Sequence, residues 1–258
     1  MIPKIIHFTW FSNYAYPEEV KRCMESWKRL MPDYEIRHWD MESISKIDSE
    51  FLREAISAKK WAYAADFVRL YAIYNFGGIY LDTDVLLFRG LDAFLNTPAF
   101  IGKETSIHIE GSKQEMYLSA HCFGAEKHNE FIGNCLKYYT NRKFILSDQD
   151  VLPVTLRFNM VLLPYIQSEI AKRDGYDPRP LNQQVQKLRS VTIYPSIAFD
   201  SEKPIKGAYC RHLALGGWRD ASYRKSFKVT LSYKINWRIR RIFENLAELF
   251  NYKLVKLK

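Results

Sequence analysis

Four charged side chains lie inside stretches that are otherwise apolar. Asp82 and Asp84 interrupt the run IYLDTDVLLF. Asp66 and Arg69 are the only charged residues between positions 61 and 76. Burying a carboxylate costs several kcal/mol, roughly, unless a cation or hydrogen bonds compensate it. We therefore expect these side chains to pair with one another or with a ligand.

The D-x-D pair has the spacing of a cation site. Residues two apart on a strand point to the same side, so Asp82 and Asp84 can reach one ligand. Two carboxylates suit Mg²⁺ or Mn²⁺, which keeps other coordination positions free for phosphate oxygens. The alternative is a strand-end turn with solvated acids. A second D-x-D, Asp148 and Asp150, lies among polar residues, and we expect a solvated loop there.

The order of apolar residues predicts the helix and strands that carry these side chains. Residues 61–76 are aromatic and aliphatic on every side, which predicts a buried helix, and Gly77 suits the left-handed position that ends it. Asp66 and Arg69, three apart, share one face of that helix. Residues 79–81 and 85–88 are strand-forming runs on either side of the two acids.

Further strands and helices alternate along the chain. Residues 4–9 and 34–39 predict strands, and helices are expected to open near 17 and 48. This β-α-β-α-β order over the first ninety or so residues predicts an α/β fold, a mostly parallel sheet flanked by helices. Later strands are expected at 99–102, 106–109, 117–124, 191–195 and 208–212, with a helix at 129–139 and broken helices within 147–177. Trp10, at the carboxyl end of the first strand, either stacks on a nucleotide base or belongs to the core.

Charge divides the chain near residue 219. The net charge is +9, and residues 219–258 contain eleven Lys/Arg and three Asp/Glu, or 11 − 3 = +8. We therefore predict a catalytic domain over 1–218 and a basic helical tail over 219–258. Its helical periodicity from 227 to 258 fits either an anionic membrane surface or packing on the body. We expect no nucleic-acid partner, because no nucleic-acid-binding module accompanies the tail.

Cysteine usage and the N-terminus bear on location. The four cysteines show no C-x-x-C spacing and indicate reduced thiols. Residues 1–4 lead directly into a strand, so no signal peptide is expected. Together with the tail, this predicts a cytoplasmic protein that is peripheral on the inner face of the cell membrane.

The motifs resemble glycosyltransferase family 32. The similarity lies in IPKIIHFTW, in YAADFVRLYAIYNFGGIYLDTDV, and in a late His followed by Gly-Gly-Trp. It is strong over residues 1–95, patchy over 96–205 and partial near 208–218. The resemblance implies a GT-A (Rossmann-like) fold, a nucleotide-sugar donor, a divalent metal (Mn²⁺ or Mg²⁺) and retention of anomeric configuration.

The resemblance also implies roles for individual residues. Donor binding would involve Thr9 and Trp10, with Trp10 on the base, and Trp218 would close over the diphosphate. Asp66 and Arg69 would hold the sugar hydroxyls. Asp82 would contact ribose and sugar, Asp84 would ligate the metal, and His212 would be a late metal or phosphate ligand. The resemblance thus implies a catalytic set of Asp66, Arg69, Asp82 and Asp84. It implies nucleotide-sugar binding by Thr9, Trp10, Asp66, Arg69, Asp82 and Trp218, and metal binding by Asp84 and His212. The sequence departs from the family at Gly217, where Ser is frequent, and in having one late His rather than two, so the third metal ligand stays open and His212 has a structural alternative.

The resulting expectation is a metal-dependent retaining glycosyltransferase. It would move a sugar from a nucleotide-sugar, UDP-linked in preference to GDP-linked, to a lipid-linked saccharide in bacterial surface polysaccharide synthesis such as capsule or O-antigen. One alternative is a haloacid-dehalogenase-type phosphohydrolase, since Asp82-Thr83-Asp84-Val85 fits its D-x-D-x-[TV] string, although that motif should follow the first strand. Another is a non-catalytic membrane or nucleic-acid adaptor acting through the tail.

Overall fold

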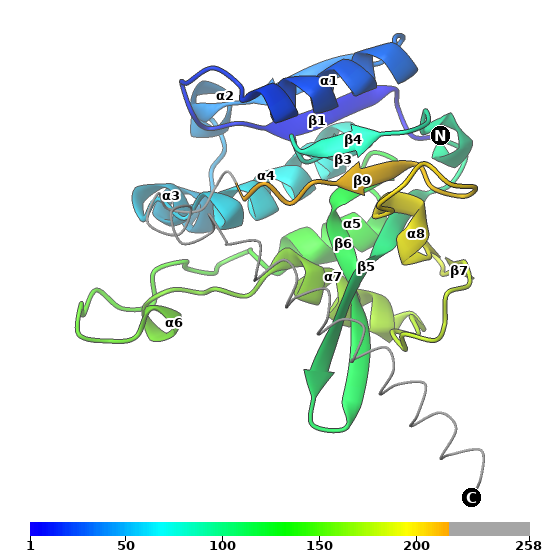
Figure 1. Cartoon of the computed structure of the whole chain (residues 1–258). Helices are drawn as coiled ribbons and strands as arrows, with labels where there is room; N and C mark the ends of the chain where they lie inside the picture. The colour runs from blue at the N-terminus through cyan, green and yellow to red at the C-terminus, as the bar shows by residue number, and fades with distance from the viewer. Residues whose placement is uncertain (217–258) are drawn as a thin grey trace, which may run out of the picture. The chain divides into compact units, whose positions relative to one another are not determined.

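Residues 1–216 are described by the computed structural model shown in Figure 1. The predictions for Trp218, for the tail and for the boundary before residue 219 lie outside these residues. The strands are β1 Ile5–Thr9, β2 Glu35–Trp39, β3 Gly78–Leu81, β4 Val85–Leu87, β5 Ala99–Glu110, β6 Lys113–Ala125, β7 Gln186–Lys187, β8 Thr192–Tyr194 and β9 Cys210–His212. The helices are α1 Glu18–Leu30, α2 Met41–Ser45, α3 Glu50–Ser57, α4 Trp61–Phe76, α5 Glu130–Lys137, α6 Val154–Arg157, α7 Leu163–Arg173 and α8 Ser196–Phe199, with a 3₁₀ turn at Asp92–Phe94.

The main sheet in the described part of the chain has seven strands in the order β2-β1-β3-β6-β5-β8-β7. Strand β1 is parallel to both β2 and β3, as the β-α-β-α-β pattern predicted. Beyond β3 the pairing changes, because β6 is antiparallel to β3 and to β5. The α/β prediction is confirmed: the first half of the sheet is parallel, and a long β5–β6 hairpin makes the whole sheet mixed.

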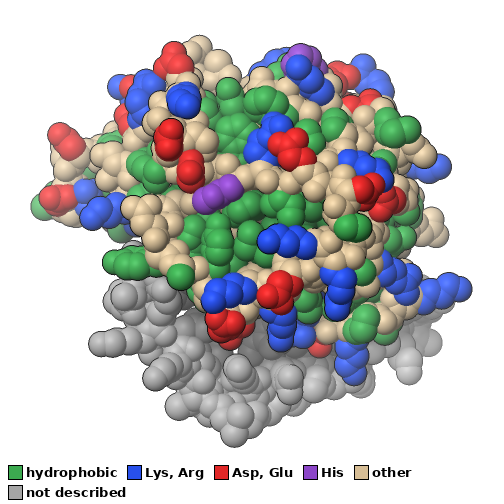
Figure 2. Space-filling model, turned by 90° about the horizontal axis from the view of Figure 1, so that it is seen from above, with side chains coloured by type: hydrophobic (Ala, Val, Ile, Leu, Met, Phe, Trp, Pro, Cys, Tyr) green, Lys and Arg blue, Asp and Glu red, His purple; other side chains and the backbone are tan. Residues whose placement is uncertain are grey.

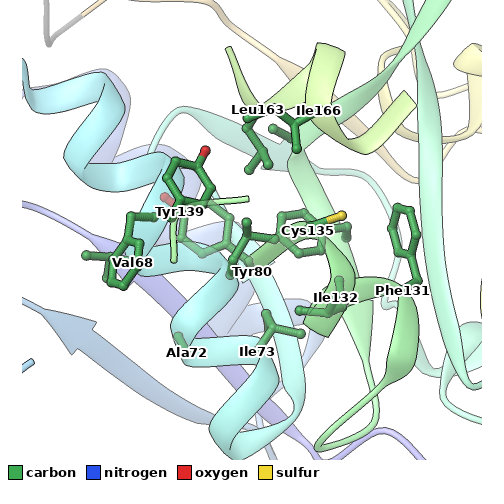
Figure 3. Close-up of a cluster of buried hydrophobic side chains, with 14 of the residues drawn as sticks. Val68, Ala72, Ile73, Tyr80, Phe131, Ile132, Cys135, Tyr139, Leu163 and Ile166 are labelled. Atoms are coloured by element: carbon green, nitrogen blue, oxygen red, sulfur yellow. The ribbon is translucent and has the colours of Figure 1, made fainter. Parts of the chain in front are cut away.

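Helix α4 is the buried helix that its composition predicted. It covers one face of the sheet and packs on α5 and α7, where a hydrophobic cluster includes Val68, Ile73 and Tyr139 (Figure 3). Gly77 ends the helix with a φ of 66°. A Cβ on Gly77 would lie 2.8 Å from the backbone nitrogen of Lys127, so glycine is required by both conformation and space. The helix therefore stops at a fixed point, and β3 begins at once.

Several boundaries differ from the sequence prediction. The two short strands predicted at 99–102 and 106–109 form one strand, β5, which contains irregularities where its register with β6 shifts. Pro164 does not break a helix within the 147–177 stretch: it lies in the first turn of α7, where proline lacks only a backbone donor that the helix would not use. Strand β4 does not extend the main sheet but pairs with β9 in a separate two-stranded sheet.

The surface of the described residues mixes charged and apolar side chains, and Figure 2 shows both kinds interspersed on one face. Among the helices of residues 1–216, none has the length and hydropathy needed to cross a bilayer. Residues 1–215 form one compact unit.

Candidate active site

The two aspartates of the D-x-D motif lie in a turn that joins the two sheets. Strand β3 ends at Leu81, and the backbone N–H of Asp82 still donates to the carbonyl of His121 on β6 (2.9 Å). The turn then closes, since the N–H of Val85 donates to the carbonyl of Asp82 (3.0 Å). Asp84 therefore lies past the end of β3, outside the main sheet and close to β9.

Strand pairing brings His212 to Asp84. Val85 on β4 pairs with His212 on β9, and His212 Nε2 lies 3.2 Å from Asp84 Oδ1. The chain after β9 then wraps around the acid, because the N–H of Leu215 donates to Asp84 Oδ2 (2.8 Å). Burial raises the pKa of Asp84, but the hydrogen bond and charge of His212 and the N–H of Leu215 together outweigh it, so the pKa lies below its ordinary value.

Asp82, Asp84 and His212 form a group that fits a divalent cation. Each offers one ligand atom, and these atoms all lie within 4.8 Å of one another. Two carboxylate oxygens and an imidazole nitrogen are ligands that Mn²⁺ accepts, and oxygen ligands are those that Mg²⁺ requires. The turn at 82–84 and the β4–β9 pairing therefore create a site with the donor atoms for a metal, on side chains that are each partly exposed.

Arg69 links the buried helix to the D-x-D turn. Its Nη2 lies 3.4 Å from Asp66 Oδ1 and 3.3 Å from Asp82 Oδ1, and its Nη1 donates to the carbonyl of Ala120 (2.6 Å). The guanidinium carbon lies 4.7 Å from the centroid of the Tyr80 ring. One buried cation therefore compensates two carboxylates and is itself held by a carbonyl and an aromatic face.

Asp66 is an ionisable group held in an unfavourable environment. Its side chain is only 8% exposed, and Oδ2 accepts a hydrogen bond from the backbone N–H of Leu163 (3.2 Å). Burial raises the pKa of Asp66 to about 6, although the charge of Arg69 and the Leu163 N–H act in the opposite direction. A carboxylate kept at this cost is typical of a functional site rather than of a core.

A hydrogen-bonded chain connects the first strand to the same turn. The Tyr80 hydroxyl donates to Asp82 Oδ1 (3.0 Å), so the Thr9 hydroxyl, 2.9 Å from the Tyr80 oxygen, donates to it. Trp10 follows Thr9 at the carboxyl end of β1. The centroid of its ring lies 5.2 Å from the centroid of the Tyr16 ring, and the side chain is partly buried. Its indole N–H donates to the carbonyl of Tyr14 (3.4 Å).

Two residues near the cation group were missed by the sequence analysis. His121 on β6 stacks on His212 with ring centroids 4.4 Å apart and an interplanar angle of 21°. Its Nε2 lies 2.9 Å from the carbonyl of Phe199, which can only accept, so Nε2 carries the proton and Nδ1 accepts from the hydroxyl of Ser119 (2.7 Å). Burial and the neighbouring His212 lower the pKa of His121 and favour this neutral form.

Nothing in the local sequence marks His121 or Ser119. They alternate on β6, a strand that has the pattern of an ordinary apolar run, and only the packing of His121 on His212, which lies in the other sheet, reveals the contact. Of the residues expected at the site, the structure therefore brings together Asp66, Arg69, Asp82, Asp84 and His212. It connects Thr9 to them through Tyr80, and it places Trp10 next to Thr9.

Comparison with known proteins matches the part of the chain that contains the aspartates. Residues 17–101 match the family described as "Glycosyltransferase sugar-binding region containing DXD motif". This stretch includes Asp66, Arg69, Asp82 and Asp84, but neither Trp10 nor His212.

Three relatives are similar over about 110 residues each. "Inositol phosphoceramide mannosyltransferase 3" of Schizosaccharomyces pombe is 40% identical over 115 residues, which is 43% of this chain and 32% of that protein. "Mannosyl phosphorylinositol ceramide synthase CSH1" of Saccharomyces cerevisiae is 35% identical over 107 residues, 40% of this chain and 28% of that protein. "Uncharacterized glycosyltransferase L373" of Acanthamoeba polyphaga mimivirus is 31% identical over 106 residues, 39% of this chain and 42% of that protein. The matched stretch spans less than half of each relative.

Among solved structures, "PaToxG Glycosyltransferase" aligns with 67% of this chain and 70% of its own, at a TM-score of 0.45 and 18% identity. The match of residues 17–101 to the family model and the similarity of the mannosyltransferase relatives confirm the resemblance inferred from the motifs, over the matched region. Residues 17–101, with the turn that carries Asp82 and Asp84, are similar to the DXD-containing sugar-binding region of glycosyltransferases.

Proposed function

We propose that this chain transfers a hexose from a nucleotide-sugar to a hydroxyl group, assisted by a divalent cation. The observation that carries the proposal is that two groups of charged side chains meet at the end of β3 and share Asp82. Asp82 and Asp84 meet His212 on one side, and Asp82 meets the buried Asp66–Arg69 pair on the other. The first set suits a diphosphate and its metal, and the second suits sugar hydroxyls.

Each part of this junction has a role in the proposed reaction. A cation bound by Asp82, Asp84 and His212 would supply Lewis-acid stabilisation of the negative charge that grows on the departing diphosphate. Asp66 accepts and Arg69 donates hydrogen bonds, so together they would orient the sugar ring. Because Arg69 is fixed by Ala120 and Tyr80, this orientation is preorganised.

The bond changes follow from the leaving group. The acceptor hydroxyl oxygen bonds to the anomeric carbon, the bond from that carbon to the diphosphate oxygen breaks, and the hydroxyl proton passes to the departing phosphate. We propose attack on the face that the diphosphate leaves, which retains the anomeric configuration. Assignment of the product anomer by NMR tests this, and an inverted product would contradict it.

The donor and acceptor are also proposals. We propose that the donor sugar is linked to UDP. The names of two relatives refer to mannosyl transfer and to inositol phosphoceramide or phosphorylinositol ceramide. These names favour a membrane lipid over a bacterial surface polysaccharide as the acceptor. A cytoplasmic location, peripheral to a membrane, remains part of the proposal, as does the membrane role of residues 227–258.

The test is a donor screen with the full chain. UDP- and GDP-linked glucose, galactose, N-acetylglucosamine and mannose are incubated with Mn²⁺ or Mg²⁺, and products are separated by chromatography. A glycosyltransferase releases nucleoside diphosphate and free sugar, whereas a phosphohydrolase using Asp82 as nucleophile releases orthophosphate. Asp84→Asn should remove the metal-dependent release. Orthophosphate as the first product, or turnover unchanged in this variant, would refute the proposal.

A further inference from the structure

Exposed apolar side chains are concentrated in one segment of the described chain. Residues 1–216 contain sixteen large hydrophobic residues that are exposed, and six of them fall within the twenty residues from 146 to 165. They are Leu146, Val151, Val154, Leu156, Leu162 and Tyr165. Single exposed apolar residues are normal, but a cluster of this kind marks an interaction surface. We call residues 146–162 the apolar arm; it includes α6 and extends away from the sheet in Figure 1.

The base of the apolar arm is firmly built. Glu54 Oε2 accepts hydrogen bonds from the N–H groups of Phe144 (2.7 Å) and Ile145 (2.8 Å). The buried ring of Phe144 stacks on that of Phe158 with centroids 5.4 Å apart, and Ile145 bridges to Phe158. The arm is therefore held at a fixed position on the body, and its outer side chains remain in water although the core is close by.

The same segment leads directly into the proposed active site. Leu163, the residue after the arm, donates its N–H to Asp66 Oδ2 (3.2 Å), and the Tyr63 hydroxyl contacts the carbonyl of Met160 (3.5 Å). Tyr63 and Asp66 are both on α4. The C-terminal end of the arm is consequently next to the carboxylate that we assign to the donor sugar.

Charge distinguishes a membrane from an apolar protein groove as the partner. Five cations lie on the arm or near where it joins the body, namely Lys59, Lys60, Arg142, Lys143 and Arg157, against four acids, Glu50, Glu54, Asp148 and Asp150. Lys60 Nζ lies 5.6 Å from the Phe158 ring centroid, and Arg157 pairs with Asp150 (2.5 Å). Exposed apolar side chains beyond a net positive base fit a bilayer, with apolar groups at the acyl boundary and cations at anionic headgroups.

We propose that the apolar arm docks on an anionic lipid bilayer and so presents a lipid-linked acceptor to the Asp66–Arg69 pair. Docking itself depends only on the arm. Its consequence for the acceptor rests on the proposed function. This surface is separate from the basic tail, which lies outside the described residues.

Vesicle binding by the full chain tests the docking. The arm variant carries Val151→Asp and Leu156→Asp, which are 90% and 59% exposed in the native chain. The control carries Ile109→Asp and Leu181→Asp, which are 69% and 81% exposed and lie elsewhere. On phosphatidylcholine vesicles containing phosphatidylserine, we expect the arm variant to lose about tenfold or more in partitioning, since two aliphatic side chains that would enter the acyl boundary are replaced by charged ones. The control should change by less than about twofold, as surface substitutions usually do.

A second measurement does not depend on loss of binding. An environment-sensitive fluorophore on Val151→Cys should shift to shorter wavelength when anionic vesicles are added, whereas the same label on Leu181→Cys should not. Equal partitioning of the arm and control variants, no vesicle binding by the native chain, or no shift at position 151 would overturn the proposal.

Donor hydrolysis separates failure of the docking proposal from failure of the proposed function. The arm variant should hydrolyse a nucleotide-sugar in solution at the native rate, because neither substituted side chain contacts Asp66, Arg69 or the D-x-D turn. If the native chain hydrolyses the donor but does not bind vesicles, the docking proposal is refuted and the proposed function is not. If the chain binds vesicles through the arm but hydrolyses no donor, the proposed function is refuted and the docking proposal is not.

Discussion

Asp66→Asn should stabilise the protein at neutral pH while it abolishes transfer. The carboxylate is buried against Leu163 and Arg69, and burial raises its pKa to about 6. A raised carboxyl pKa means that the native state binds the proton more tightly than the unfolded state. The stability from this group is therefore full below its ordinary pKa of 3.8 and is lost as pH rises through about 6.

The magnitude follows from these two pKa values. Linkage gives a loss in the free energy of unfolding of about 3 kcal/mol at pH 7.5 and of about 1 kcal/mol at pH 4.5 for the native carboxyl. Asparagine has nearly the same shape and cannot ionise, so it stands for the protonated acid. We expect Asp66→Asn to exceed the native protein in stability by about these amounts at the two pH values.

Urea denaturation followed by circular dichroism at pH 4.5 and 7.5 measures the difference. Asp48→Asn is the control, because its carboxylate is 99% exposed and pairs with Arg53 only at the surface. That change should shift stability by less than about 0.5 kcal/mol at either pH. If Asp66→Asn were destabilising at pH 7.5, or if its advantage did not grow with pH, then pairing with Arg69 would outweigh burial and the reasoning would be wrong.

The remaining predictions concern ligand binding. Asp84→Asn should weaken Mn²⁺ binding by at least about 100-fold, which is more than the loss of a residue that only supports a metal ligand causes. Electron paramagnetic resonance of free Mn²⁺ measures the affinity, and an unchanged affinity would exclude Asp84 as a ligand. His121→Ala should weaken Mn²⁺ binding by about tenfold because His212 loses the ring that stacks on it, and the same titration would contradict this if the affinity held. Trp10→Ala should raise the Kd for UDP or GDP by about tenfold, as loss of a base-stacking ring does, and calorimetry with Tyr14→Ala, an 87% exposed control, checks it; equal effects of the two changes would assign Trp10 to the core.

The local elements of this fold could be predicted because their causes are local. Residues 61–76 are apolar on all sides, so they form a helix that must be buried, and Gly77 supplies the positive φ that ends it. The acids at 82 and 84 are conspicuous for the same reason, since a charge within an apolar run requires a partner. Residues 99–110 were less legible because one strand with shifted register resembles two short ones.

The sequence by itself therefore determined the helix–strand unit, the four charged residues in it and their chemical class. The tertiary structure decided which of their partners come from far along the chain. His212 reaches Asp84 through the β4–β9 register, His121 reaches His212 from a strand of the other sheet, and Leu163 reaches Asp66 across 97 residues. Such contacts depend on strand order and register, which are set by packing of the whole sheet and leave no periodic signal near either residue.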